Sequence, residues 1–472
     1  MRSGSRRSPR SEHDRGGDIE TDHRPTPRRR ARSRIGTATA VLGAVGMLAL
    51  SGCGSTTLDD IKVGPGKGWP AAYHDARNSG ASPVTGSRHL VPSWTRPLGG
   101  PAAAATLIGP GGQLFVTTRM PGDCVGKPGT VGAMFAFQMP TGRKRFCNPM
   151  GPDAIAAGSA VDGLDNVYVG DNGGLISFNA LGQPRWRTPV AGVPVSVQFT
   201  SEGDVLSVTQ SGQVDVVDRQ TGNLRSATFQ ALGEPDFLTQ AGLPRPPDGQ
   251  GIGDCVTGGP QCPVANVSAI EEGSGRFYVT VWRPGAPMAS LVALRYADKQ
   301  IRQEWSVDIL AEGSATAPTL AADGTTVYVG DNSGRLLAVD AADGRTKWTQ
   351  PLGFSPRGAV SEQDGLLIPG GDDGHLLALR DEGDAVRIAW ERKDLQLRGR
   401  PVQTAGDTGY VVAPIGDTLS LVTFQPSDGT TVASAELPGA QGTAVGTAVS
   451  AEGDVVVTTR IGELFAFKPD ED

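Results

Sequence analysis

The stretch "VYVGDNSGRLLAVDAADGRTKW" at residues 327–348 closely matches "VYVGDNGGLISFNALGQPRW" at residues 167–186. Both copies alternate β-branched or apolar runs with turns of Asp, Asn and Gly, which is the pattern of short antiparallel strands joined by hairpins. Just upstream of the later copy, "ATAPTLAADG" adds a strand of small residues and one more Asp-Gly turn. The repeat therefore predicts a unit of four antiparallel strands.

The two central strands of this unit occur eight times along the chain. The copies contain "QLFVTTR", "NVYVGDNGGLISFNA", "DVLSVTQSGQVDVVD", "RFYVTVW", "TVYVGDNSGRLLAVD", "GLLIPGGDDGHLLALR", "GYVVAPIGDTLSLVTF" and "DVVVTTRIGELFAFK". Their spacing, mostly ~35–50 residues, is that of propeller blades. The sequence thus predicts an all-β fold, an eight-bladed β-propeller of four-stranded antiparallel blades.

The last copy ends at "FAFKPDED" before a fourth strand can form, and the strand that completes it is found near the other end. The segment "PSWTRPL" at residues 92–98 has the pattern of a fourth strand, and its Trp94 occupies the repeat position of four other tryptophans: Trp186, Trp305, Trp348 and Trp390. We expect this N-terminal strand to close the ring, which removes both exposed sheet edges. We expect each tryptophan to pack its apolar body against the neighbouring blade.

The G-x-x-x-W pattern of the last strands, and "GWPAAYHDARNSGASP" at residues 68–83, resemble the PQQ-like β-propeller repeat superfamily. The resemblance covers about residues 68–472. That superfamily includes BamB-type lipoprotein scaffolds and quinoprotein alcohol dehydrogenases, so the resemblance implies either a scaffold or a cofactor-binding enzyme.

Several features favour the non-enzymatic branch. The dehydrogenases of this superfamily use a disulfide between adjacent cysteines, and this sequence has no Cys-Cys pair. Their tryptophan-docking motifs are expected to be degenerate or absent here. No metalloprotease, nucleophile-elbow or P-loop motif occurs, and "GQGIGD" at residues 249–254 is interpreted as a loop. We therefore expect no catalytic residue, no cofactor and no metal; Asp372, Asp373 and His375 are interpreted as a solvated turn.

The N-terminus has the organisation of an export signal. A basic region ending in "RRRARSR" precedes the apolar run "IGTATAVLGAVGMLAL" and the residues "SGC". This order is typical of a secretory signal, and Leu50-Ser51-Gly52-Cys53 resembles the bacterial lipobox, which implies lipidation at Cys53. We expect a signal peptide at residues 1–52, a lipidated tether at 53–67 and the propeller at 68–472; the alternative is an uncleaved anchor helix.

Charge and cysteine content agree with an exported protein. Residues 1–52 hold 11 Arg and 5 acidic residues of the 43 basic and 50 acidic residues in the chain, so the remainder carries a net charge of −13. Such a charge argues against nucleic acid as a partner. Besides Cys53, four cysteines remain, and their spacing favours disulfides Cys124–Cys147 and Cys255–Cys262 in an oxidising compartment; free thiols are the alternative.

The long insertions are expected on one face of the ring. In a propeller, the loops between the second and third strands and the connections between blades emerge on the same face, and the excursions at 119–131, 230–263 and 282–290 all belong there. The same face is predicted to carry positive charge, which marks a contact surface for a protein or an anionic ligand; scattered solvated charge is the alternative. The candidate residues are Arg357, Arg392, Lys393, Arg398 and Arg400.

The sequence as a whole predicts a lipid-anchored, extracytoplasmic and monomeric protein of the bacterial cell membrane. Its propeller is expected to serve as a protein–protein interaction scaffold. The alternative is a propeller that binds a PQQ-like cofactor or another small ligand, such as a degenerate quinoprotein.

Overall fold

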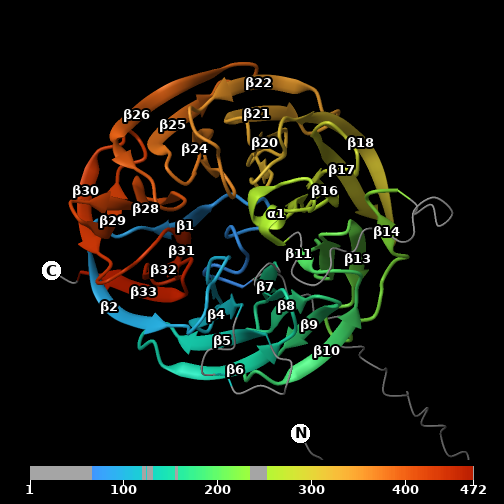
Figure 1. Cartoon of the computed structure of the whole chain (residues 1–472), viewed down its shortest axis with the longest axis horizontal. Coiled ribbons are helices and arrows are strands. Elements are labelled where there is room, and N and C mark those ends of the chain that lie inside the picture. The colour runs from blue at the N-terminus through green and yellow to red at the C-terminus, as the bar shows by residue number, and fades with distance from the viewer. Residues whose placement is uncertain (1–65, 120–123, 125–130, 155–157, 234–251, 471–472) are drawn as a thin grey trace, which may run out of the picture. The chain divides into compact units, whose positions relative to one another are not determined.

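A computed structural model describes residues 66–119, 124, 131–154, 158–233 and 252–470. These residues form eight antiparallel sheets arranged as the blades of a closed ring, numbered here in chain order (Figure 1). The prediction of an eight-bladed β-propeller is therefore confirmed. The predicted signal peptide, Cys53 and the predicted tether up to residue 65 lie outside the described residues, whereas the last two residues of that predicted tether, 66 and 67, are described.

The first four blades follow one another in chain order. From the innermost strand outward they are β3 (Leu107–Ile108), β4 (Gln113–Thr118), β5 (Gly132–Gln138) and β6 (Lys144–Met150); β7 (Ser159–Val161), β8 (Val167–Asp171), β9 (Gly174–Phe178) and β10 (Pro184–Pro189); β11 (Pro194–Phe199), β12 (Val205–Thr209), β13 (Gln213–Val217) and β14 (Phe229–Gln230); and β15 (Ala269–Glu271), β16 (Arg276–Val281), β17 (Ala289–Ala297) and β18 (Gln300–Leu310).

The next four blades complete the ring. They are β19 (Thr319–Leu320), β20 (Thr326–Gly330), β21 (Arg335–Asp340) and β22 (Thr346–Pro351); β23 (Ser361–Gln363), β24 (Leu366–Ile368), β25 (His375–Asp381) and β26 (Val386–Gln396); β27 (Val402–Ala405), β28 (Thr408–Ile415), β29 (Thr418–Phe424) and β30 (Thr431–Glu436); and β31 (Ala444–Val449), β32 (Val455–Thr459) and β33 (Glu463–Pro469) with β2 (Leu90–Pro97).

The ring closes as the sequence predicts. Strand β2 pairs antiparallel with β33, from Leu90 opposite Pro469 to Pro97 opposite Glu463, and so supplies the missing outer strand of blade 8. A second N-terminal strand, β1 (Ala81–Thr85), adds to blade 7 in parallel with β27. No repeat copy pointed to β1, and the sequence analysis did not predict it.

The inner strands are buried on both sides because each blade packs between two others. All five residues of β8, "VYVGD", are buried. Between blades 5 and 6, Leu336 and Ala338 pack in one cluster with Leu377 and Leu379. Removing apolar area from water in this way, at ~25 cal/mol per Å², is the main stabilisation of such a ring.

Five tryptophans join one blade to the next through a shared geometry. The Trp94 indole Nε1 donates to the Met139 carbonyl at 2.7 Å, and its ring lies so close to Gly142 that a Cβ there would stand 2.5 Å from the ring. The other donors and acceptors are Trp186 to Arg219 O, Trp305 to Ala341 O, Trp348 to the Asp381 carboxylate and Trp390 to Pro426 O. The expected packing role is confirmed, whereas the expectation that tryptophan docking is degenerate or absent is wrong for these blades.

Blade 3 departs from the repeat. Its outer strand β14 is two residues long, although "LRSATFQ" has the length of a full strand, and it pairs only with Gln213 and Val214 of β13. The connection that follows contains helix α1 (Ile252–Thr257), which begins inside "GQGIGD". The interpretation of residues 252–254 as a loop is therefore wrong.

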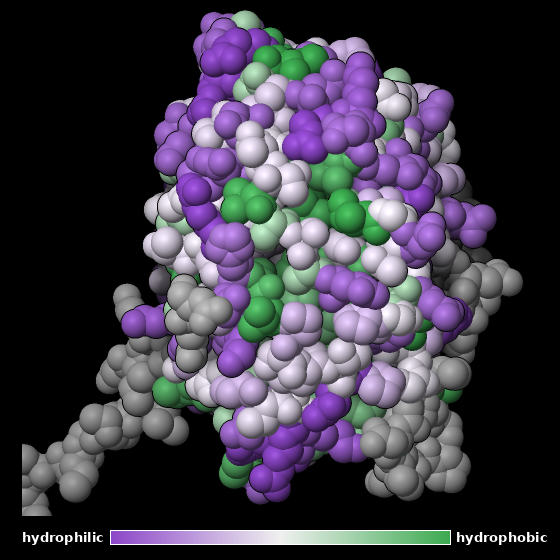
Figure 2. Space-filling model, turned by 90° about the vertical axis from the view of Figure 1, so that its left-hand side faces the viewer, coloured by the Kyte–Doolittle hydropathy of each residue, from purple (hydrophilic) through white to green (hydrophobic). Residues whose placement is uncertain are grey.

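The two faces of the ring are named here by the loops they carry. The upper face has the loops between second and third strands and the connections between blades; the lower face has the remaining turns. The flank, seen around β30 in Figure 2, mixes apolar residues among hydrophilic ones. Outer strands such as β30 alternate exposed and partly buried residues.

Candidate binding face at the centre of the ring

The described part of the chain begins at the lower face of the ring with residues 66–88, which we name the leading segment. The Gly66 amide donates to the Val161 carbonyl at 3.0 Å. Val161 is the last residue of β7, directly before a lower-face turn. A Cβ on Gly66 would stand 2.7 Å from Pro110, which lies in the corresponding turn of blade 1. Residue 66 is therefore fixed between two lower-face turns.

From there the leading segment passes through the centre of the ring, where Figure 1 shows it in blue. Its backbone bonds in turn with the innermost strands of six blades: Trp69 with Ile108, Pro70 with Val161, Ala76 with Ile270, Arg77 with Leu320, Ser79 with Glu362, and β1 with β27. Blade 3 is reached by a side chain, because Gln198 Nε2 donates to Asn78 Oδ1 at 3.2 Å. Together with β2 in blade 8, the N-terminal part of the propeller contacts every blade.

Asn78 is the most enclosed polar residue of this segment. It is fully buried, and its Nδ2 donates to Val267 O at 3.2 Å and Pro318 O at 2.9 Å. Its backbone φ is +56°, a conformation that asparagine tolerates better than most residues. Asn78 thus satisfies carbonyl groups of two blades that no strand partner reaches.

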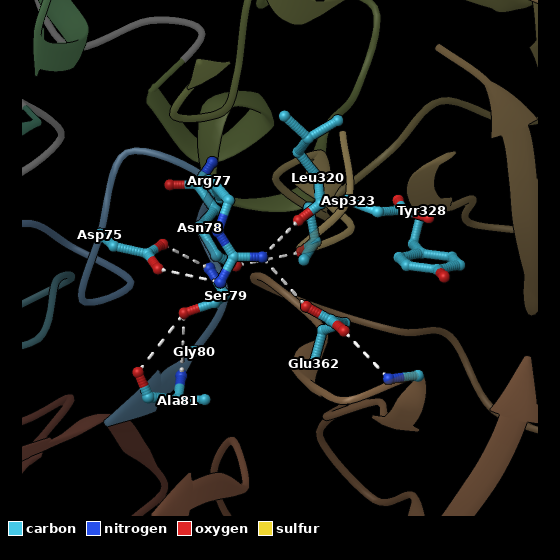
Figure 3. Close-up of polar contacts among 12 residues, drawn as sticks. Asp75, Arg77, Asn78, Ser79, Gly80, Ala81, Leu320, Asp323, Tyr328 and Glu362 are labelled. Atoms are coloured by element: carbon cyan, nitrogen blue, oxygen red, sulfur yellow. Dashed lines mark hydrogen bonds and ion pairs between the residues drawn. The ribbon is translucent and has the colours of Figure 1, made fainter. Parts of the chain in front are cut away.

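Arg77 anchors the segment by charge (Figure 3). Its Nη1 donates to Leu320 O at 3.0 Å and to Glu362 Oε2 at 3.1 Å, and its Nη2 contacts Asp75 Oδ2 at 3.4 Å. Burial raises the pKa of Glu362 despite the opposing effects of the Gly365 amide and Arg77. Burial also acts to raise the pKa of Asp75, but His74 and Arg77 outweigh it and the pKa is lowered. The cluster is accounted for as a structural anchor of the leading segment.

The upper face carries α1 and both disulfides. Cys255, in α1, is bonded to Cys262, with their Cα atoms 5.0 Å apart. Cys124 is bonded to Cys147 of β6, with Cα atoms 5.7 Å apart. Helix α1 is fastened over the centre of the ring, because Val256 O accepts a hydrogen bond from Arg357 at 3.4 Å.

Beside α1 lies a hollow of ≈ 160 Å³, which we name the upper cavity. Four guanidinium groups line it: Arg119, Arg357, Arg400 and Arg460. One carboxylate, Asp372, lies 3.6 Å from Arg357 and 3.2 Å from Arg460. The lining thus carries four positive charges and one negative charge.

The structure separates the five candidate residues of the predicted contact face. Arg357 and Arg400 line the upper cavity. Arg398 lies beside it and pairs with the exposed Asp373. Arg392 and Lys393 instead belong to the outer strand β26. There they pair with Asp394 at 2.8 Å and Glu391 at 3.2 Å respectively.

Sequence reasoning missed Arg119 and Arg460, although each is the last residue of the same "VTTR" run, in blades 1 and 8 respectively. Their positions are equivalent, because the Arg119 amide donates to Pro101 O and the Arg460 amide to Thr443 O, each in the connection leading into its own blade. Asn172 and Asn332 hold this position in blades 2 and 5, with the same backbone bond. The signal available in the sequence was that blades 1 and 8, which are neighbours in the closed ring, both have arginine at this position.

The described residues contain no group of three or more His, Cys, Asp and Glu side chains placed to hold a metal ion. Asp372 and Asp373 pair with arginines, and His375 Nε2 lies 2.7 Å from Glu391 Oε1. Among the helices of the described part, none is long and apolar enough to cross a lipid bilayer.

The sequence of this chain is similar to that of a known protein over most of its length. Protein Rv3035 of Mycobacterium tuberculosis (strain ATCC 25618 / H37Rv) is 36% identical over 428 residues, which cover 89% of this chain and 100% of the relative. The chain belongs to the family of Protein Rv3035, within the PQQ-like β-propeller superfamily. The resemblance noted from the repeats is therefore confirmed.

Other matches connect this family to BamB. Residues 266–471 match the sequence family described as "Outer membrane protein assembly factor BamB". The protein of that name from Burkholderia pseudomallei (strain K96243) is 26% identical over 380 residues, covering 77% of this chain and 86% of the relative.

Solved structures share the fold at low identity. BamB from Moraxella catarrhalis superposes with a TM-score of 0.54 at 15% identity, covering 80% of this chain and all of that one. A europium-containing methanol dehydrogenase gives 0.58 at 12% identity, covering 85% of this chain and 98% of that one. Since BamB and a methanol dehydrogenase resemble this ring about equally well, the fold alone does not assign the function.

Proposed function

We propose that this protein is a lipid-anchored, extracytoplasmic scaffold whose upper face binds another protein of the cell envelope. The observation that carries the proposal is that the two faces of the ring differ in the structural features they hold. The leading segment meets the ring at the lower face, next to Val161. Helix α1, both disulfides and the arginine-lined cavity belong to the upper face.

A lipid attached to Cys53 would give the two faces of the ring different positions relative to the membrane. From Cys53 to residue 66 the chain spans at most ~45 Å when fully extended, at ~3.3–3.6 Å per residue. We propose that such a tether holds the lower face towards the membrane surface and leaves the upper face directed away from it. Loops held by disulfides on a rigid ring are suited to recognition.

The names of the relatives support a protein as the partner. Both the matched sequence family and the Burkholderia pseudomallei relative are described as an outer membrane protein assembly factor. The sequence lacks the adjacent cysteines of the quinoprotein dehydrogenases. The proposal accordingly assigns this chain no catalytic role.

Anchoring is tested with Cys53→Ser, using Ser55→Ala as the matched control. We expect the wild type and the control to incorporate an alkyne-labelled fatty acid and to partition with membranes, and Cys53→Ser to lose the label. Labelling of Cys53→Ser at the wild-type level would contradict the anchor.

The contact face is tested by charge reversal. Arg398→Glu with Arg400→Glu is compared with Arg345→Glu, an arginine in a lower-face turn. We expect the upper-face variant to lose proteins that the wild type and the control retain in a pull-down from envelope extracts; an unchanged set would contradict the charged part of the face. The alternative of a quinoprotein is tested by adding PQQ with Ca²⁺, where dye-linked alcohol oxidation would overturn the scaffold proposal.

A further inference from the structure

The upper cavity has more positive charge than its own carboxylate balances. Asp372 is shared by Arg357 and Arg460. Within the described part of the chain, the Arg119 side chain has no hydrogen bond or ion pair, and it is exposed. Guanidinium groups brought together without matching carboxylates attract an anion, and their planar forks fit carboxylate oxygens in pairs.

The fourth guanidinium, that of Arg400, is held in place by the fold. Its Nη1 donates to Val445 O at 2.7 Å, and its guanidinium carbon lies 5.5 Å from the centre of the Tyr73 ring. Gly358 gives it room, because a Cβ there would stand 2.1 Å from Arg400 Nε. A cation fixed before binding loses little conformational freedom when a ligand arrives.

An apolar compartment adjoins the arginines. A second hollow of ≈ 100 Å³, which we name the apolar compartment, is lined mostly by Ala and Val residues together with Tyr73, and also by the polar residues Ser159, Asn266 and Arg400. It shares Ala103, Val256 and Arg400 with the upper cavity. Arg400 therefore stands where a charged compartment meets an apolar one.

This arrangement suits a ligand with two unlike ends. A free inorganic anion would use the arginines and leave the apolar compartment in contact with water. A neutral apolar molecule would gain the second compartment but would leave the guanidiniums unpaired. An organic acid with a short apolar body satisfies both compartments at once.

We propose that the upper cavity and the adjoining compartment form a binding site for a small organic carboxylate, whose acid group pairs with Arg119 and Arg400 and whose apolar body contacts Val256 and Tyr73. The site goes beyond the proposed scaffold function and does not rest on it, because a scaffold needs no small-molecule ligand. The two are separately measurable, since ligand binding is read on the purified protein and scaffolding on captured envelope proteins.

The test titrates the purified full-length protein with hexanoate in a calorimeter, alongside acetate, 1-hexanol and hexylamine. We expect hexanoate to bind at one saturable site, acetate to bind more weakly because it has almost no apolar body, and the alcohol and the amine to give no saturable binding. Equal affinity for hexanoate and acetate would overturn the role of the apolar compartment. Equal affinity for hexanoate and hexanol would overturn the role of the arginines.

Variants locate the site. Arg119→Ala and Arg400→Gln are each expected to weaken hexanoate binding about tenfold or more, as loss of a charge-assisted hydrogen bond does. Arg345→Ala, on the lower face, removes the same charge and should leave the affinity unchanged. Arg119 makes no side-chain bond among the described residues, so Arg119→Ala should keep the wild-type melting temperature. Wild-type affinity in both upper variants, or the same loss in Arg345→Ala, would overturn the proposal, as would no binding of hexanoate at all.

Discussion

The indole Nε1 of Trp94 donates a hydrogen bond of 2.7 Å to the carbonyl oxygen of Met139. Trp94 belongs to β2, which completes blade 8, and Met139 follows β5 in blade 1. The strand that closes the ring by sheet pairing with β33 is therefore also fastened to the first blade. One strand thus closes the ring through two contacts of different kinds, backbone pairing within blade 8 and a side-chain hydrogen bond to blade 1.

Replacing Trp94 should open this joint. We expect Trp94→Ala to lower the free energy of unfolding by about 2–4 kcal/mol, because the ring leaves a void against Gly142 and the Met139 carbonyl loses its donor. Trp94→Phe should cost less, since it keeps an aromatic body and loses mainly the hydrogen bond. Denaturant unfolding followed by far-UV circular dichroism measures both, and a smaller loss in the alanine variant than in the phenylalanine variant would contradict this account.

Gly142 gives a sharper test of the same joint. It has φ = +59°, and an added Cβ would stand 2.5 Å from the Trp94 ring. Gly439 also has a positive φ, +73°, but a Cβ there meets nothing within 4 Å. Both alanine variants bear the strain of a left-handed backbone, roughly 1 kcal/mol. We therefore expect Gly142→Ala to lower the melting temperature more than Gly439→Ala; equal shifts would show that Trp94 does not press on Gly142.

The leading segment should give the ring a dependence on acid. The pKa of Asp75 is lowered in the folded protein by His74 and Arg77 against the effect of burial. Its ionised form therefore stabilises the fold above the unfolded pKa, near 3.9, and this contribution is lost as pH falls through the lower, folded pKa. We expect Asp75→Asn to reduce the free energy of unfolding by about 1–2 kcal/mol at pH 7, and by progressively less below pH 4.

Asn at position 75 keeps an acceptor for the Ser79 amide, which lies 2.8 Å from Asp75 Oδ1. The variant therefore isolates the charge. Denaturant titrations of wild type and variant at pH 7 and at pH 3 measure the difference; a difference that stays constant, or grows as pH falls, would contradict the assigned charge state.

The sequence predicted the parts of the fold that repeat. Each blade uses the same two-residue alternation and the same turns. For this reason, short stretches of sequence were enough to predict the eight strand pairs, the tryptophan position and the closing strand. Blade 1 shows the limit of that reading: Phe146 takes the place of the tryptophan and packs on Gly182, where a Cβ would stand 2.5 Å from its ring. Blade 1 therefore makes the same kind of aromatic contact with the next blade, although the residue is Phe and not Trp.

The course of the leading segment and the upper cavity could not be predicted from the repeat. Residues 66–88 have no repeat partner, and they bond with strands up to 323 residues away, as where the Tyr410 hydroxyl donates to Ser87 O. The cavity arginines come from four separate connections, which only the closed ring brings together. Helix α1 was missed because its glycine-rich sequence has low helix propensity, and its disulfide and its contact with Arg357 hold it instead.

The central claim, that the upper face meets a protein partner while the lower face is turned to the membrane, is tested most directly by photocrosslinking in intact cells. Ile461 lies in an upper-face loop and is 48% exposed, and Leu181 lies in a lower-face turn and is 66% exposed. Each is replaced by p-benzoylphenylalanine in the full-length protein. We expect a discrete crosslink to another envelope protein from position 461 and none to that protein from position 181. Crosslinks to a protein partner from position 181 alone would contradict it.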